Sequence, residues 1–225
     1  MNEWINIILI IVILTIPAIA QAGIMINYKK YKGINNKANL SGFEVARKIL
    51  DANGLSDMDI VSTPGNLTDH YDPSRKVVRL SQEVFDGTTV ASTAIAAHEC
   101  GHAIQDKEGY VMMRIRSAIV PIVNIGTKLS YAIILIGLLF EAIGLVYVGI
   151  ALTSLGLLFQ IITLPVEFDA SKRAKVQIDR LQIATIDEEK GVKKVLKSAA
   201  MTYVAGVLSS ILQVLRLVLM FTRRD

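Results

Sequence analysis

The sequence predicts a mostly helical membrane protein that also carries a smaller α+β domain outside the bilayer. Of its 225 residues, 52% are hydrophobic, and the mean hydropathy of +0.46 is too high for an ordinary soluble domain. The apolar residues fall into three long runs, and most charged residues lie in the two segments between them. This alternation predicts three or four transmembrane helices and one extramembrane domain built from two pieces of chain.

The first apolar run predicts a transmembrane helix within residues 1–27. Residues 5–26 contain no charged side chain, and at ~1.5 Å per residue they can cross a hydrocarbon core of ~30 Å. A signal peptide cleaved after Ala18-Ile19-Ala20 is the alternative, but no Lys or Arg precedes the run and the run continues past that site. Lysines follow the run, so the positive-inside tendency places the next segment in the cytoplasm.

A second apolar region, residues 119–165, predicts a transmembrane hairpin. It is too long for one span and fits two, near residues 122–140 and 145–165, with a turn at residues 141–144. Glu141 is one of two charged residues in this region. The favoured interpretation is a carboxylate in water at the tip of the hairpin, and the alternative is a functional acid within the membrane.

The last apolar run lies at residues 199–221, within a C-terminal segment of residues 199–225, and two interpretations of it stay open. Gln213 and Arg216 interrupt the run. As a fourth span it would place the terminal arginines outside, against the positive-inside tendency, whereas as an amphipathic helix it would lie at the cytoplasmic interface. The span is favoured, with Arg216 facing the helix bundle.

The two polar segments, residues 28–118 and 166–198, are each small, so we expect them to build one cytoplasmic domain together. The net charge of +4 reflects lysines that would lie beside an anionic leaflet. No basic stripe with interleaved aromatic residues is present, which argues against a nucleic-acid partner. The partners we expect are the lipid bilayer and a protein or peptide.

Local patterns predict the elements of the first polar segment. A capping-box pattern at Ser41 begins a helix, and Asn53-Gly54 ends it. Residues 59–62 and 76–81 have the composition of strands, with a turn at residues 71–74 before the second strand.

The segment His98-Glu99-Cys100-Gly101-His102 predicts a zinc site. It lies in an alanine-rich run that predicts a helix from near Thr88 or Thr89. Because residues four apart on a helix project from one face, His98 and His102 can bind one zinc ion, while Glu99 can reach a metal-bound water as the general base. This pattern is typical of a zincin-like catalytic domain. The alternative is a buried metal-free cluster held by hydrogen bonds. Cys100 points off the ligand face, so we expect a small buried residue that is neither a ligand nor a nucleophile.

A catalytic zinc ion needs a third protein ligand, and the residues after the motif supply no further histidine. The best candidate is Glu167, in a segment predicted to start a helix just beyond the hairpin, because the hairpin returns the chain to the membrane face it left. Ala170 and Ala174 are small enough to let this helix pack closely on the metal helix. The alternative is that Glu167 and Asp169 are simply acids favoured in a first helical turn.

These motifs resemble those of the YugP-like family of bacterial membrane zinc metallopeptidases. The resemblance rests on residues 98–105 with Glu167-Phe168-x-Ala170 after a membrane hairpin, and it extends over nearly the entire chain. The sequence is more distantly similar to the HtpX and CaaX prenyl peptidase group, in which His-Glu-x-x-His is paired with a later Glu-x-x-Ala-Asp. The resemblance implies that Glu167 is the third zinc ligand, in a gluzincin-like site with one zinc ion per chain. Ser171 stands where the distant group has Asp, so the support of the ligands must differ here.

The function expected from these features is that of a membrane-embedded zinc metalloendopeptidase. Zinc-bound water activated by Glu99 would hydrolyse peptide bonds, with membrane proteins among the substrates. His70 or Tyr71 could stabilise the oxyanion, although a His-Tyr pair flanked by Asp is more often a turn element. The active site would face the cytoplasm at the plasma (inner) membrane of a bacterium.

Two other functions are alternatives. An intramembrane peptidase of the site-2 type would place the zinc motif inside a span, but only about ten uncharged residues precede His98. A non-catalytic membrane scaffold would hold zinc for structure alone.

Overall fold

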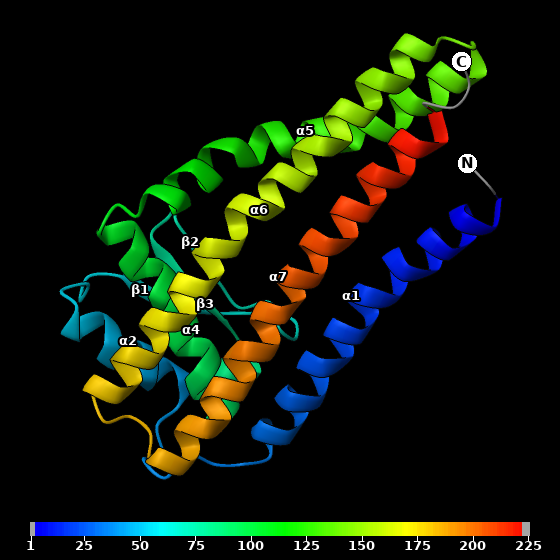
Figure 1. The fold of residues 1–225 in the computed structure, drawn as a ribbon. Coiled ribbons are helices and arrows are strands. Elements are labelled where there is room, and N and C mark those ends of the chain that lie inside the picture. The colour runs from blue at the N-terminus through cyan, green and yellow to red at the C-terminus, as the bar shows by residue number, and fades with distance from the viewer. Residues whose placement is uncertain (1–2, 222–225) are drawn as a thin grey trace. The chain divides into compact units, whose positions relative to one another are not determined.

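The structure, a computed structural model, describes residues 3–221 and is mostly helical (Figure 1). Residues 1–2 and 222–225, which include the terminal arginines, lie outside the described residues. The elements in chain order are α1 (Glu3–Lys32), α2 (Gly42–Ala52), β1 (Asp59–Thr63), β2 (His70–Asp72), β3 (Val77–Ser81), α3 (Gln82–Asp86), α4 (Val90–Lys107), α5 (Val111–Leu139), α6 (Ile143–Arg180) and α7 (Ile186–Phe221).

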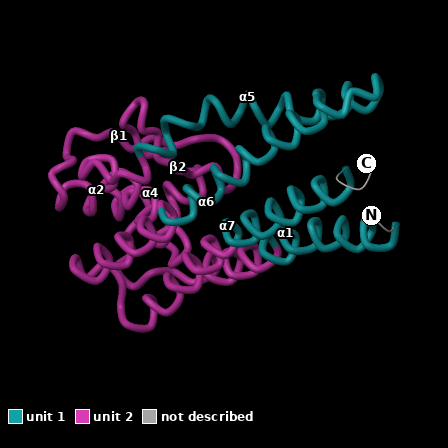
Figure 2. Tube along the Cα trace, turned by 45° about the horizontal axis from the view of Figure 1, so that its top comes forward, with its two compact units in different colours: residues 1–21, 114–165, 202–225 teal, residues 22–113, 166–201 magenta. Residues whose placement is uncertain are grey.

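The chain divides into two compact units (Figure 2). One, here called the helical unit, is drawn from residues 1–21, 114–165 and 202–225. The other, here called the mixed unit, is drawn from residues 22–113 and 166–201 and holds the sheet together with α2, α3 and α4.

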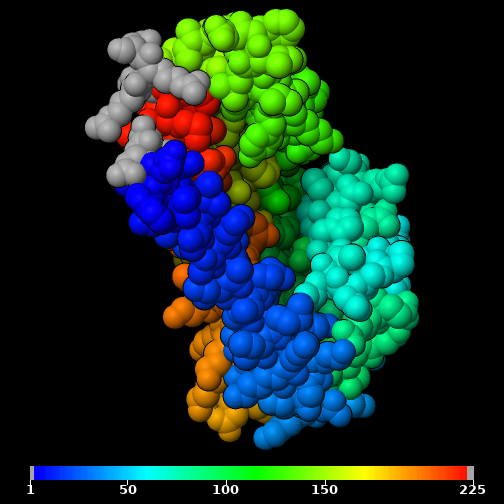
Figure 3. All heavy atoms as spheres, turned by 90° about the vertical axis from the view of Figure 1, so that its right-hand side faces the viewer, coloured from blue at the N-terminus to red at the C-terminus, as the bar shows by residue number. Residues whose placement is uncertain are grey.

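Four helices, α1, α5, α6 and α7, are long and apolar enough to cross a membrane. The clearest is α1, whose most apolar 18-residue window has no buried residue and whose isoleucine and leucine side chains are widely exposed. Figure 3 shows this helix, in blue, on the surface that faces the viewer. Exposed side chains of this kind are unfavourable in water and favourable in lipid.

The turn between α5 and α6 lies at residues 140–142 and so only overlaps the predicted turn at residues 141–144, and the helices on either side are longer than the predicted spans. Glu141 is exposed in the turn between α5 and α6, with a positive φ of 53°. The prediction that a new helix starts after residue 165 is wrong, because α6 runs through Pro165 without a break. A proline inside a helix removes one backbone hydrogen bond at a cost of ~3 kcal/mol. Helices of membrane proteins nevertheless tolerate proline, because neighbouring groups can satisfy the freed backbone carbonyl.

The mixed unit contains a three-stranded sheet with the order β1-β3-β2. The strand β1 is parallel to β3, and the edge strand β2 is antiparallel to β3, with Tyr71 opposite Val78. The sequence analysis placed a turn at residues 71–74, and this prediction is wrong in part because the turn begins only after Asp72. Pairing with β3 and burial of the Tyr71 side chain outweigh the local turn signal.

Two local predictions are confirmed in the helices that surround the site. The helix α2 begins after a complete capping box formed by Ser41 and Glu44, and Thr89 caps α4 by accepting a hydrogen bond from the backbone N–H of Ser92. The apolar face of α2 packs on α4 through Val45, Ile49 and other fully buried residues.

The helices α4 and α6 meet at a very close contact within the mixed unit. A Cβ atom built on Gly101 would lie 2.5 Å from the backbone oxygen of Ala170. Ala170 and Ala174 are both fully buried, so this stretch of α6 has no bulky side chain that would hold the helices apart. Only glycine at position 101 permits this approach.

Replacing Gly101 by Ala is expected to destabilise the protein by about 1–3 kcal/mol, because the added methyl group must push the two helices apart. Thermal unfolding in detergent should show a lower midpoint. The matched control is Gly144→Ala, where a Cβ atom would have no neighbour within 4 Å. Equal midpoints for the two variants would contradict the packing described here.

Candidate metal centre

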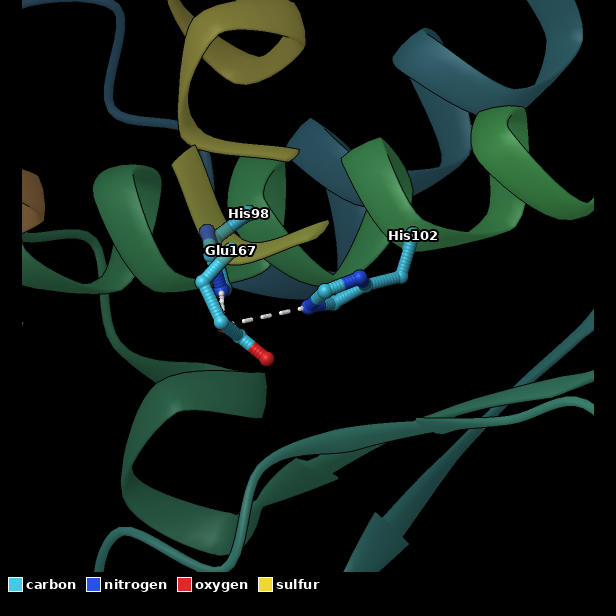
Figure 4. A group of neighbouring side chains, drawn as sticks. All are labelled: His98, His102 and Glu167. Atoms are coloured by element: carbon cyan, nitrogen blue, oxygen red, sulfur yellow. Dashed lines mark hydrogen bonds and ion pairs between the residues drawn. The ribbon is translucent and has the colours of Figure 1, made fainter. Parts of the chain in front are cut away.

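Three potential metal ligands come together between α4 and α6 (Figure 4). His98 and His102 project from one face of α4, and Glu167 projects from α6 toward both rings. One ligand atom from each residue lies within 4.8 Å of the other two. Among residues 3–221 this is the one group of three or more His, Cys, Asp or Glu side chains with such spacing.

The distances within this group suit a single zinc ion. Oε2 of Glu167 lies 3.3 Å from Nε2 of His98 and 3.6 Å from Nε2 of His102. Two donor atoms that each lie ~2.1 Å from one zinc ion at a tetrahedral angle are roughly 3.4 Å apart. Two imidazole nitrogens and one carboxylate oxygen are also a donor set that zinc accepts readily.

The ring of His102 is held by Gln105, one helical turn further along α4. The carboxamide nitrogen of Gln105 donates to the carbonyl oxygen of Val166 at 2.8 Å and to Oδ2 of Asp169 at 2.8 Å. Since both partners are acceptors, the carboxamide oxygen must face His102, where it lies 3.0 Å from Nδ1. Nδ1 therefore carries the proton, and the lone pair of Nε2 points toward Glu167.

The ring of His98 has a different support. Its Nδ1 atom lies 3.3 Å from Oγ of Ser171, which is on α6 one turn beyond Glu167. This serine occupies the position at which the sequence departs from the more distant peptidase group. A hydroxyl group can accept the ring N–H and so favour the same tautomer as in His102.

Glu99 lies beside this group and is not part of the ligand set. Its side chain is buried, and burial raises its pKa to about 7. The charge of His98 and the backbone N–H of Tyr71 lower this pKa. The nearby carboxylates of Glu167 and Asp69 act together with burial to raise it, and about 7 is the net result. A carboxyl group with a pKa near neutrality can accept a proton and return it at the same pH.

Asp69 is a residue for which the sequence analysis assigned no role. Oδ1 of Asp69 accepts hydrogen bonds from the backbone N–H of Ser81 at 2.7 Å and from its hydroxyl group at 3.0 Å. These bonds tie the loop before β2 to the end of β3. Burial raises the pKa of Asp69, and its charge acts on Glu99. The sequence alone does not indicate that Asp69 lies near Glu99, because the two residues are thirty positions apart and belong to different parts of the fold.

The weaker candidates for the oxyanion have other partners. The Tyr71 hydroxyl donates to Oδ2 of Asp106 at 2.8 Å, and Nδ1 of the exposed His70 lies 2.8 Å from the carbonyl oxygen of Thr68. The hydrogen-bond partners of both side chains thus lie outside the group of three potential ligands.

Cys100 points away from the ligand face, as expected from its position on the helix. Its side chain is fully buried, and Sγ lies 3.6 Å from the carbonyl oxygen of Ala46 in α2. Burial raises the pKa of the thiol, so the thiolate that could bind metal or attack a substrate is disfavoured.

Replacing Glu167 by Gln is expected to lower zinc affinity by more than roughly 100-fold, because a neutral amide is a poor zinc ligand. Loss of a residue that only supports a ligand typically lowers the affinity by roughly 10–100-fold. Metal content after dialysis against a chelator measures this loss. The control is Asp179→Asn, which removes an exposed acid from the same helix. Unchanged zinc content in the Glu167 variant would exclude it as a ligand.

Replacing Gln105 by Leu is expected to lower zinc affinity by roughly 10–100-fold, because the ring of His102 then loses the acceptor that fixes its tautomer. Competition with a chromogenic chelator measures the affinity, and Gln82→Leu serves as an exposed control. An affinity equal to that of the unmodified protein would show that Gln105 does not support the ligand.

Comparison with known proteins confirms the expected resemblance. A family model described as "Putative neutral zinc metallopeptidase" matches residues 6–222. The chain is 42% identical over 218 residues to the "Putative membrane protease YugP" of Bacillus subtilis (strain 168), and the alignment covers 95% of this chain and 97% of that protein. No solved structure matches the chain. The name of this relative and the four long apolar helices support a membrane protein. With nearly its whole length matched, the chain belongs to this family of neutral zinc metallopeptidases.

Proposed function

We propose that this protein is a membrane-embedded zinc metalloendopeptidase with a gluzincin-like site. The observation that carries the proposal is the grouping of His98, His102 and Glu167 at zinc-ligand spacing, with the buried carboxyl group of Glu99 beside them. A metal site used only for structure is normally closed by four protein ligands, whereas three ligands leave a position for water.

The chain's own residues supply the proton transfers of peptide hydrolysis. When bound, zinc acts as a Lewis acid that lowers the pKa of water and polarises a carbonyl group. Glu99 takes the proton of the attacking water and later delivers it to the leaving amine, for which a pKa near 7 is well suited. Gln105 and Ser171 hold the two imidazole rings in the tautomer that leaves Nε2 free for the metal.

The edge strand β2 provides a surface for an extended substrate. It has β3 on one side only, and the backbone of its residue Tyr71 lies close enough to Glu99 to lower the pKa of that carboxyl group. A peptide that pairs with the free edge of β2 would therefore have its backbone close to the proposed general base. This arrangement supports an endopeptidase, because a peptide can extend past the site in both directions.

The proposed site faces the cytoplasm at the plasma (inner) membrane of a bacterium, and membrane proteins are among its substrates. The support comes from the basic residues Lys29, Lys30 and Lys32 in the last turn of α1, which the positive-inside tendency places in the cytoplasm. An intramembrane mechanism has less support, because α4, which carries the zinc motif, is not one of the four candidate spans.

Replacing Glu99 by Gln is expected to lower peptide hydrolysis by roughly 10²–10⁴-fold, because the site loses its proton acceptor. Zinc content should be unchanged. The assay uses the purified full-length protein in detergent with a quenched fluorescent peptide, and Glu189→Gln removes an acid of α7 as the control.

The same variant separates the enzyme from a structural zinc scaffold. Proteomics of membrane fractions should find proteins that accumulate with the Glu99 variant and not with the unmodified protein. Retained hydrolysis by the variant would contradict the assigned general base, and an absence of hydrolysis by the unmodified protein together with full zinc content would favour the scaffold.

A further inference from the structure

The helical unit contains a cavity of about 410 Å³ whose wall is unusually polar for an apolar bundle. The cavity lies within this unit alone, and all four candidate spans contribute to its wall. Eight of its twelve lining residues carry a hydroxyl or carboxamide group: Thr127, Ser130, Tyr131, Thr153, Gln160, Ser209, Ser210 and Gln213. No Asp, Glu, Lys or Arg is among these twelve described residues.

The lining residues lie near the middle of each apolar run. Ile13 lies near the centre of the run in α1, and Ser209 lies near the centre of the run in α7. Residues 127–131 of α5 and 153–160 of α6 have equivalent positions. In a bilayer these polar groups would lie far from both aqueous phases, where unpaired hydrogen-bonding groups are costly.

Four of the six hydroxyl groups in the wall donate a hydrogen bond to a backbone carbonyl oxygen. Thr127, Ser130 and Thr153 donate to carbonyl oxygens of their own helices at 2.7–3.0 Å. The Ser209 hydroxyl donates across to the carbonyl oxygen of Ile13 at 3.2 Å and so joins α7 to α1. These four residues stabilise the wall and leave little free hydrogen-bonding capacity.

The two glutamines differ from these four residues. Neither the Gln160 nor the Gln213 carboxamide has a hydrogen-bond partner among residues 3–221. The carboxamide of Gln160 lies over the backbone of α7, since a Cβ atom on Gly206 would be 2.5 Å from its Oε1 atom. Each carboxamide therefore brings two donors and one acceptor to the cavity that the protein does not use.

We propose that this cavity binds a short non-helical stretch of polypeptide backbone within the membrane. A regular transmembrane helix pairs its own N–H and C=O groups, so it has no use for the glutamines, whereas a broken helix exposes both kinds of group. The C=O of a peptide group can accept a hydrogen bond from a carboxamide N–H, and its N–H can donate to a carboxamide oxygen. Lipid acyl chains offer neither group, and a phosphate headgroup would require a cationic residue that the wall lacks.

This proposal rests on the proposed function and names a substrate class for it: membrane segments whose helix is interrupted. A peptidase needs an extended substrate, and an interrupted helix already has an extended stretch. Binding and cleavage are nevertheless separate measurements, because binding can be followed in the Glu99→Gln background, in which the probe stays intact.

The test uses two fluorescent single-span peptides of about 20 residues, built from Leu and Ala, in nanodiscs of phosphatidylcholine and phosphatidylglycerol. One peptide has a central Gly-Pro-Gly break and the other is unbroken. Full-length protein should bind the broken peptide at least about tenfold more tightly. The double substitution Gln160→Leu with Gln213→Leu should remove this preference, and Gln21→Leu, on an exposed residue of α1 outside the cavity, should retain it.

A photocrosslinking experiment keeps the proposal testable if the double variant does not fold. The photoreactive residue p-benzoylphenylalanine in place of Tyr131, which lines the cavity, should crosslink to the broken peptide. In place of Tyr147, which is exposed on α6 outside the cavity wall, it should not. Equal binding of the two peptides, or equal crosslinking from the two positions, would overturn the proposal. Loss of hydrolysis with intact binding preference would instead count against the proposed function alone.

Discussion

The close contact between α4 and α6 at Gly101 and Ala170 is the constraint on which the metal centre depends. Gly101 lies between the two histidines on α4, and Ala170 lies one helical turn beyond Glu167 on α6. Because the two backbones almost touch at this point, the short side chain of Glu167 can reach both imidazole rings. A Cβ atom at position 101 would lie 2.5 Å from the backbone oxygen of Ala170, so a larger residue there would push the helices apart and disturb the short ligand distances that zinc requires.

The two imidazole rings of the site are held by neutral side chains and not by charged ones, and this affects the electrostatics of the site. The two imidazole rings are held by the carboxamide of Gln105 and the hydroxyl of Ser171, both of which are neutral. Carboxylates are common in such positions and make the rings more basic. Here a further carboxylate would add a negative charge near Glu99, whose pKa is already raised to about 7, and a like charge raises the pKa of a carboxyl group. Neutral support of the rings is thus compatible with a buried general base.

Much of this architecture could be predicted because its signals are local. The capping box at Ser41, the cap at Thr89 and the one-turn spacing of the histidines each involve residues within four positions of one another. The proximity of Glu167 could be argued only from the return of a membrane hairpin, together with a resemblance to known peptidases. The structure does bring this residue beside both histidines.

The features that could not be predicted depend on contacts between distant segments. The strand β2 has three residues and a strong turn signal, and it exists because β3 pairs with it. The role of Asp69 depends on Ser81, twelve positions away, and on burial beside Glu99. The polar cavity brings together residues from four helices, and of these only Gln213 stood out in the sequence, as an interruption of its apolar run. Gln105 is an exception, since its position three residues after His102 places it on the ligand face and the sequence contained that information.

The sole cysteine of the chain, Cys100, lies between the two histidines and faces α2. Its sulfur is buried and contacts the carbonyl oxygen of Ala46. Maleimides and other alkylating agents can reach this sulfur only when α2 separates from α4. The rate of alkylation therefore reports how often the core beneath the metal helix opens, with no label added. For the same reason the folded protein behaves toward such agents as though it had no thiol, so single cysteines introduced elsewhere can carry spectroscopic labels without a background signal.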